Sequence, residues 1–280
     1  MEIGVMMFPT DKAIQPIPLA VEAENRGFES IWFPEHSHIP SSRVTPWGGR
    51  KGAPPLPEEY WRSHDQFVAL AAVAGATSSI KLATGITLVA QRDPLWLAKE
   101  VASLDMISGG RFIFGIGYGW NKEEMANHGL AYTERRAVTR EVMLACQAIW
   151  ASEEFSFSGE HFSYEPGWSW PKPTQQPHPP ILMGAAPGPK TIGDIVEFCD
   201  GWMPIHGRYD VFDQLDVIKK EWEAAGRDLD QFKWGVFAIP PTEQAITEYA
   251  EAGADYAAFA LPSEGPDTIL PKLDELAKLL

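Results

Sequence analysis

The stretch Pro180-Ile181-Leu182-Met183-Gly184-Ala185-Ala186-Pro187-Gly188-Pro189-Lys190-Thr191-Ile192-Gly193 joins an apolar run to a helix start through a very short turn. The apolar residues 181–183 predict a strand, and the small residues after them let backbone N–H groups come close to a ligand. Pro189 predicts the first helical turn, because its missing N–H would be unpaired there. Free N–H groups at a helix N-terminus bind phosphate, so residues 184–188 are a candidate phosphate cradle. The same residues suit equally a turn that only packs the helix on a sheet.

Strand and helix patterns alternate eight times along the chain. The strands are predicted by short apolar runs at residues 3–8, 29–33, 80–89, 111–117, 181–183, 200–205, 232–239 and 254–261. Because these runs lack strict apolar and polar alternation, we expect a parallel sheet covered by helices and closed into a (β/α)8 TIM barrel. A single barrel domain over residues 1–280 is compatible with this length.

Two stretches do not fit the alternation. Residues 37–62 form a long loop rich in Pro and Gly after the second strand, and loops of this length often act as lids. Residues 151–179 form an aromatic, Pro-rich insertion before the fifth strand, which we expect to be a small hairpin that covers the barrel. Between the two, Ser63 and Gln66 predict a helix start of the capping-box type.

Composition bounds the possible partners. The chain carries 38 acidic and 23 basic residues, a formal net charge of −15 that would repel nucleic acid and anionic membrane surfaces. The N-terminus lacks the basic flank and long apolar segment of a secretory signal, so we expect a cytoplasmic protein. Cys146 and Cys199 have no neighbours at metal-ligand spacing and are expected to be buried thiols.

In a barrel of this kind the ligand site lies where the βα loops meet, at the C-terminal ends of the strands. The unusual residues of the chain fall there: Pro34-Glu35-His36, Gly85-Ile86-Thr87, Gly117-Tyr118-Gly119-Trp120 and the turn 184–188. A dinucleotide-binding interpretation of Gly115 and Gly117 fails, because Trp120 occupies the position of the third glycine.

The segments Leu104–Phe112 and Gly115–Asn121, together with Gly184-Ala185-Ala186 and Cys199–Trp202, resemble the bacterial luciferase-like monooxygenase superfamily. Residues 32–36 and 185–189 are similar to its branch that uses the deazaflavin coenzyme F420. The resemblance extends from Ile3 to Leu280. It implies an oxidoreductase that transfers a hydride between F420 and a small organic substrate, and that forms a homodimer.

The resemblance also implies roles for individual residues. His36 would give or take a proton near the reacting carbon, with Glu35 as a second catalytic candidate. Gly85, Ile86 and Thr87 would form a bulge under the coenzyme ring, commonly with a non-prolyl cis peptide, although a plain β-bulge is the alternative. Residues Gly117, Tyr118, Gly119, Trp120 and Asn121 would border the ring and its side chain, and Gly184, Ala185, Ala186, Pro187 and Gly188 would hold the phosphate. Sugar-phosphate-oxidising relatives have Glu at the position of Trp120, which argues against their substrate.

Three positive side chains, Arg43, Arg50 and Lys51, are the only charges between residues 37 and 57. The deazaflavin coenzyme carries a phosphodiester and a glutamate tail, so this basic loop is a candidate site for the tail. An ordinary solvated loop is the alternative. The aromatic residues of the loop, Trp47, Tyr60 and Trp61, and those of the insertion, Trp168 and Trp170, suggest an apolar or ring-shaped substrate, or pack among themselves.

Three other functions compete. The same fold could use reduced FMN and oxygen as a monooxygenase, which is different chemistry because a deazaflavin has carbon in place of the ring nitrogen. A metal-dependent barrel hydrolase is suggested by His36 and His38, but such enzymes need ligands on later strands that the sequence does not place, so we expect no metal. A non-catalytic flavin-binding subunit is the third alternative.

Overall fold

The computed structural model describes all 280 residues and contains a closed barrel of parallel strands. The sheet order is β3-β2-β1-β11-β10-β9-β8-β5-β4, and a further pairing of β3 with β5 closes the ring. The strands are β1 (Glu2–Met6), β2 (Ser30–Phe33), β3 (Lys81–Thr84), β4 (Thr87–Leu88), β5 (Phe112–Gly117), β8 (Ile181–Met183), β9 (Gly201–Trp202), β10 (Lys233–Phe237) and β11 (Tyr256–Ala260). Since β4 continues β3 beyond a bulge, eight strand positions form the barrel, and the predicted (β/α)8 fold is confirmed.

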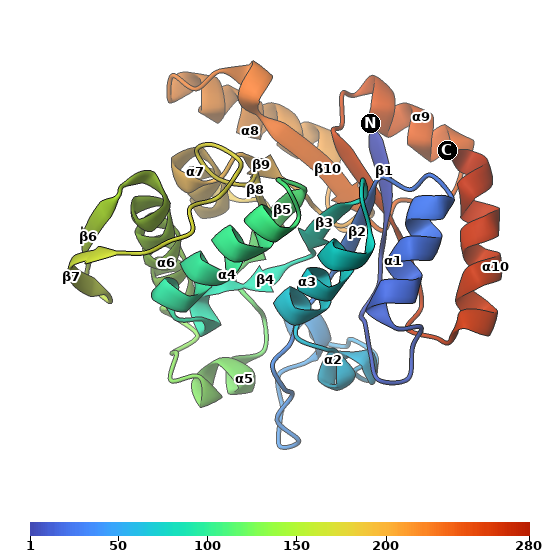
Figure 1. Ribbon diagram of the computed structural model, residues 1–280, viewed down its shortest axis with the longest axis horizontal. Coiled ribbons are helices and arrows are strands. Elements are labelled where there is room, and N and C mark those ends of the chain that lie inside the picture. The colour runs from blue at the N-terminus through green and yellow to red at the C-terminus, as the bar shows by residue number, and fades with distance from the viewer.

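Helices surround the barrel on its outside (Figure 1). They are α1 (Pro16–Asn25), α3 (Gln66–Ala76), α4 (Pro94–Ile107), α6 (Arg135–Ala151), α7 (Pro189–Phe198), α8 (Val211–Ala224), α9 (Glu243–Glu251) and α10 (Pro266–Leu276). None of the helices is both long enough and apolar enough to cross a membrane. The helix α3 begins differently from the prediction, because Asp65 accepts the N–H of Val68 as its N-cap. The Ser63 hydroxyl instead donates to the carbonyl of His36.

The apolar residues form two layers, which explains why the strands lack strict alternation. A small apolar cluster fills the inside of the barrel. Every strand position except β1 contributes one or two side chains to it: Trp32, Ala83, Ile113, Leu182, Met203, Phe237, Tyr256 and Ala258. A larger cluster of 62 buried residues fills the space between the strands and the helices. Both faces of each strand are therefore buried, as in other parallel sheets. Cys146 and Cys199 are buried and free, as predicted.

The two insertions lie in different places. Residues 37–62, with the short helix α2 (Glu59–Arg62), lie at the same end of the barrel as α5 (Lys122–Asn127), toward the lower edge of Figure 1. Residues 151–179 form an antiparallel hairpin of β6 (Glu154–Ser158) and β7 (Ser163–Trp168). The hairpin packs beside α4 and α6 rather than over the strand ends, so the expectation that it covers the barrel is wrong. Its Trp168 is 75% exposed.

Candidate functional site

A cavity of about 400 Å³ opens at the C-terminal ends of the strands. Of the residues predicted from the sequence, those that line it are Glu35, His36, Trp47, Gly85, Ile86, Gly117, Tyr118, Gly119, Trp120, Gly184, Ala185 and Ala186. Those that lie outside its lining are Thr87, Asn121, Pro187, Gly188, Arg43, Arg50 and Lys51. The lining also contains residues that the sequence does not assign to a coenzyme or catalytic role: Phe8, Gly48, Gly49, Tyr60, Leu88, Tyr132, Arg135, Arg136, Ile205, Arg208 and Tyr209. Most of the candidate residues are therefore brought together in one place.

His36 is held by a buried glutamate that the sequence analysis did not connect with it. Its Nδ1 lies 2.7 Å from Oε2 of Glu124, whose side chain is fully buried. The other carboxylate oxygen accepts the backbone N–H of Ser37 at 3.2 Å. Because a carboxylate only accepts hydrogen bonds, Nδ1 carries the proton, and Nε2 is left as the imidazole atom available to the cavity.

The position of Glu124 follows from the start of α5. The side chain of Asn121 accepts the N–H of Glu124 as the N-cap of this helix, which explains why Asn121 is buried beside the cavity without lining it. Asn121 and Glu124 have cap spacing in the sequence. That spacing predicts the helix start, but it contains no sign that the carboxylate reaches a histidine 88 residues away.

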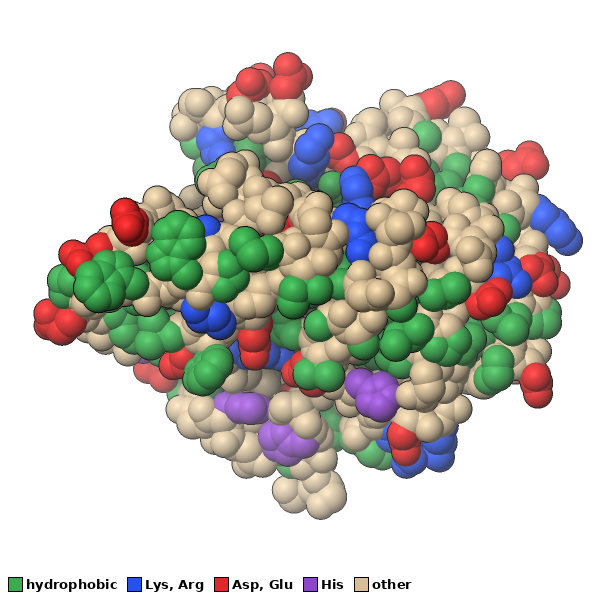
Figure 2. All heavy atoms as spheres, viewed as in Figure 1, with side chains coloured by type: hydrophobic (Ala, Val, Ile, Leu, Met, Phe, Trp, Pro, Cys, Tyr) green, Lys and Arg blue, Asp and Glu red, His purple; other side chains and the backbone are tan.

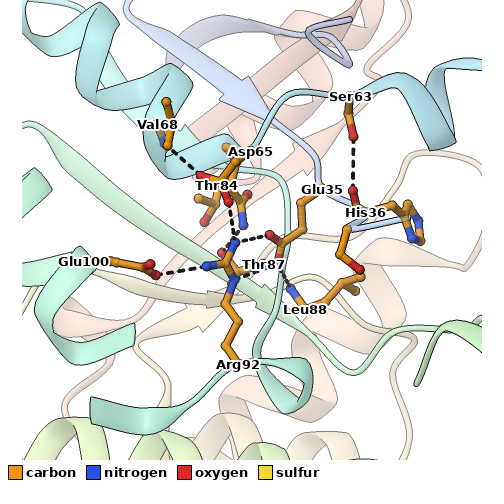
Figure 3. A network of polar contacts seen from close by, with 12 residues as sticks. Glu35, His36, Ser63, Asp65, Val68, Thr84, Thr87, Leu88, Arg92 and Glu100 are labelled. Atoms are coloured by element: carbon orange, nitrogen blue, oxygen red, sulfur yellow. Dashed lines mark hydrogen bonds and ion pairs between the residues drawn. The ribbon is translucent and has the colours of Figure 1, made fainter. Parts of the chain in front are cut away.

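Glu35 points away from the imidazole and into an ion-pair network (Figure 3). Its carboxylate lies 2.5 Å from Nη2 of Arg92 and accepts the N–H of Leu88 at 2.6 Å. Arg92 also pairs with Glu100 and Asp65. Burial opposes the charge of Arg92, but the neighbouring carboxylates outweigh it and raise its pKa. Both carboxylate oxygens of Glu35 therefore have partners, and one of them holds the backbone of β4 in place. Neither oxygen contacts His36.

The bulge between β3 and β4 fills the floor of the cavity. The Gly85-Ile86 peptide is cis, as the resemblance implied. A Cβ at Gly117 would lie 2.5 Å from Cδ1 of Ile86, and a Cβ at Gly184 would lie 2.4 Å from its Cγ2. Glycine at these two positions therefore makes room for the Ile86 side chain. Thr87 lies behind the bulge, where its hydroxyl accepts from the Gln66 amide at 2.9 Å.

The turn after β8 has the strand, turn and helix that its sequence predicts, and it presents free donors. The backbone N–H groups of Ala185, Ala186 and Gly188 donate to no group of the chain. Beside them, Nη2 of Arg136 contacts Thr191 Oγ1 at 3.1 Å and Asp194 Oδ2 at 3.0 Å. This end of the cavity therefore has the composition of an anion site.

Two further features mark the same end of the cavity. The Arg135 guanidinium donates from Nη1 to the Tyr132 carbonyl at 2.7 Å, whereas its Nε is buried with no partner in the chain. Tyr118, whose ring lies under Arg136, donates its hydroxyl to Asp194, and its pKa is raised by burial and by this carboxylate. The two adjacent arginines at the start of α6, in an otherwise acidic chain, were the signal in the sequence for this end of the site.

The opposite end of the cavity is aromatic. The ring of Tyr60 lies 4.6 Å from that of Phe8, 5.2 Å from His36 and 5.8 Å from Trp47, measured between centroids. Trp120 lies 5.6 Å from His36 in an edge-on arrangement. Burial raises the pKa of Tyr60, so its phenol stays neutral, although nearby positive charges act in the opposite direction. The imidazole thus faces a pocket of aromatic rings.

Among the basic residues of the loop 37–62, Arg43 is fixed by contacts within the chain, and the role of all three at the coenzyme tail stays a prediction. Arg43 lies over the Trp120 ring, 5.8 Å from its centroid, and donates to the Thr45 carbonyl. Arg43 lines a neighbouring hollow instead of the cavity. Arg208, from the segment between β9 and α8, lines the cavity, is exposed to solvent and forms no ion pair.

No group of three His, Cys, Asp or Glu side chains is arranged as metal ligands would be. His36 is paired with Glu124, and His38 contacts the side chains of Ser37 and Asn127. His206 contacts the hydroxyl of Tyr249 at 3.0 Å. Each of these three histidines therefore has hydrogen-bond partners other than the two remaining ones.

Comparison with known proteins identifies the family. The family model described as luciferase-like monooxygenase matches residues 12–267. A protein of Mycobacterium tuberculosis described as uncharacterized is 36% identical over 283 residues, which cover 100% of this chain and 99% of the relative. The F420-dependent hydroxymycolic acid dehydrogenase of the same species is 28% identical over 258 residues, covering 89% and 66%. The FMNH(2)-dependent dimethylsulfone monooxygenase of Pseudomonas putida is 32% identical over 168 residues, covering 58% and 46%.

Solved structures share the fold over the whole chain. The monooxygenase RslO1 from Streptomyces bottropensis superposes with a TM-score of 0.80 at 21% identity, covering 100% of this chain and 98% of that one. An F420-dependent secondary alcohol dehydrogenase, solved with an F420-acetone adduct, gives a TM-score of 0.78 at 17% identity with the same coverage. At such low identity these likenesses establish the barrel alone.

Proposed function

The chain belongs to the luciferase-like monooxygenase family, and we propose that it is an oxidoreductase that transfers a hydride between coenzyme F420 and a small organic substrate. The observation that carries the proposal is the His36–Glu124 pair, which directs one imidazole nitrogen into a cavity with an anion site at its other end. Relatives that use F420 and relatives that use FMN both occur in the family.

The residues of the cavity suit a phosphorylated tricyclic coenzyme. The free amides of Ala185, Ala186 and Gly188 would hold a phosphate, and the unpartnered Nε of Arg135 would gain an acceptor from it. The bulge at Gly85 and Ile86 would support the ring. The role of Glu35 is then one of positioning, because its carboxylate fixes the backbone that follows the bulge.

When bound, the deazaflavin supplies the chemistry of hydride acceptance and donation. The chain supplies the proton. If the substrate is an alcohol, His36 Nε2 accepts the O–H proton as the carbon loses its hydride, and a ketone remains. Glu124 stabilises the imidazolium formed at that moment, and in the reverse reaction the same nitrogen returns the proton. The aromatic rings around His36 exclude water from the reacting atoms.

The alternative is an FMN-dependent monooxygenase that uses reduced flavin and oxygen. It is supported by the 32% identity to the dimethylsulfone monooxygenase, and the phosphate of FMN would suit the same free amides. The guanidinium of Arg208, which lines the cavity, is exposed and forms no ion pair, favours the deazaflavin, because the acidic tail of the deazaflavin continues beyond the phosphate while FMN ends there.

The test is retention of coenzyme by the purified protein. We expect F420 to bind more tightly than FMN by at least about tenfold, as measured by quenching of coenzyme fluorescence. A His36→Gln variant should keep this affinity within about threefold and lose most of the turnover. Tight binding of FMN, with oxygen consumption after its reduction, would support the alternative. Retention of neither coenzyme would refute both.

We also propose that the protein forms a homodimer through the outer face of α3 and α4. Large apolar side chains are exposed there: Val68, Leu95, Trp96, Met106 and Ile107. Figure 2 shows apolar side chains spread over this side of the molecule. A second copy of the same face would bury them, as symmetric dimers do. Light scattering after gel filtration should give twice the mass of the chain, and a Trp96→Glu change should give the monomer.

A further inference from the structure

The cavity has two chemically different ends, and only one of them suits a coenzyme phosphate. The free amides and two arginines of α6 lie at one end. At the other end, around His36, the side chains are Phe8, Trp47, Tyr60 and Trp120. The substrate must therefore contact the aromatic end if it is to reach the imidazole.

The rings at that end form a connected wall drawn from separate segments of the chain. Phe8 follows β1, Trp47 and Tyr60 come from the loop 37–62, and Trp120 follows β5. Trp47 and Tyr60 pack edge-on at 5.8 Å, and Tyr60 lies 6.2 Å from Trp120. Rigid rings of this kind offer a large apolar contact area with little loss of side-chain entropy on binding.

The one carboxylate that lines the cavity, that of Glu35, is already paired. Glu35 is paired with Arg92, and Glu124 lies behind the imidazole. Glu123 accepts the N–H groups of Val44 and Thr45, which fastens the loop to α5. His36 is therefore the side chain at the aromatic end that is placed to exchange a proton with the substrate.

We propose that the aromatic end binds an uncharged, ring-shaped alcohol or ketone, with its oxygen at His36 Nε2. The proposal rests on the proposed function and names its substrate class. The reaction needs one proton and one hydride: the alcohol gives its O–H proton to His36 and its carbon-bound hydride to the F420 coenzyme. Apolar rings gain affinity from contact with Trp47 and Tyr60, whereas a charged group there would lose its hydration without a partner.

Arg208 is the one feature that favours a charged substrate, because its cation could bind an anionic substituent. Its guanidinium lines the same cavity as Tyr60 and Trp47. We assign Arg208 to the coenzyme tail, since a chain that crosses the mouth would pass it. Comparison of a neutral ring with its carboxylate analogue separates the two assignments.

The experiment is calorimetric titration of the F420-loaded protein with cyclohexanone and with 4-oxocyclohexanecarboxylate. We expect the neutral ketone to bind at least about tenfold more tightly. Trp47→Ala should weaken its binding about tenfold and leave the affinity for F420 within about threefold. Trp168→Ala is the matched control, because Trp168 is exposed on the outer hairpin and its loss should change neither affinity. Tyr60→Leu serves as the second variant if Trp47→Ala does not fold.

The outcomes distinguish the substrate class from the coenzyme. Equal or tighter binding of the carboxylate, lost in Arg208→Gln, would overturn the uncharged class. Equal effects of Trp47→Ala and Trp168→Ala would overturn the aromatic site. Cyclohexanone binding without retention of F420 would leave the aromatic site intact and refute the proposed coenzyme.

Discussion

Replacement of Glu124 by Gln tests the pairing on which the proposed mechanism depends. The carboxylate receives Nδ1 of His36 at 2.7 Å and the N–H of Ser37 at 3.2 Å in a fully buried position. An amide keeps only one acceptor oxygen, so it cannot serve both donors, and it carries no charge to stabilise the imidazolium. Loss of a charge-assisted hydrogen bond costs about 1.5–3 kcal/mol, which corresponds to a rate about 10- to 150-fold lower.

The assay has two parts. Stopped-flow absorbance of F420 with excess cyclohexanol reports the rate of hydride transfer, and nitrogen-15 NMR of histidine reports which imidazole nitrogen carries the proton. We expect Glu124→Gln to lower the rate and to lose the strict Nδ1–H tautomer, while F420 affinity changes by less than about threefold. Glu123→Gln is the control, because the neighbouring carboxylate contacts the loop 37–62 and not His36. A Glu124→Gln protein with the wild-type rate and tautomer would refute the reasoning.

Three further predictions concern the support of the site and the fold. Glu35→Gln should lower the free energy of unfolding in urea by about 2–3 kcal/mol, because Arg92 loses its ion pair with Glu35. Hydride transfer should slow less than threefold. A much larger loss of rate would make Glu35 catalytic. Gly117→Ala should cost about 1–3 kcal/mol and weaken F420 binding, and Ile86→Val in the same chain should recover part of the loss, since the added methyl would lie 2.5 Å from the Cδ1 of Ile86, an atom that valine lacks. Burial alone would raise the pKa of Glu24, but the backbone N–H donors of the turn before β3 lower it to about 2. The stabilisation is therefore present above the ordinary pKa of about 4.5 and is lost as the pH falls toward 2, so Glu24→Gln should cost about 1–2 kcal/mol at pH 7 and flatten the loss of stability with acid.

The parts of the site that could be predicted from the sequence are those fixed by local structure. The strand 181–183 and the helix start at Pro189 follow from neighbouring residues, and so does the position of His36 at a strand end. The pairing of His36 with Glu124 depends on how two strand ends meet across the barrel, which no local pattern contains. Glu35 was a plausible proton carrier by position, and only the location of Arg92 shows that its carboxylate is occupied.

The charge distribution links the fold to the proposed ligand. In a chain with a net charge of −15, several arginines away from the cavity pair with carboxylates, as Arg26, Arg62 and Arg140 do. Of the three arginines that line the cavity, Arg136 pairs with Asp194, whereas Arg135 and the exposed Arg208 form no ion pair. The Nε of Arg135 is buried without an acceptor, and this raises the free energy of the empty site. The proposed anionic coenzyme would supply an acceptor to Arg135 and to the free amides of the β8 turn at once, so the two features favour the same class of ligand.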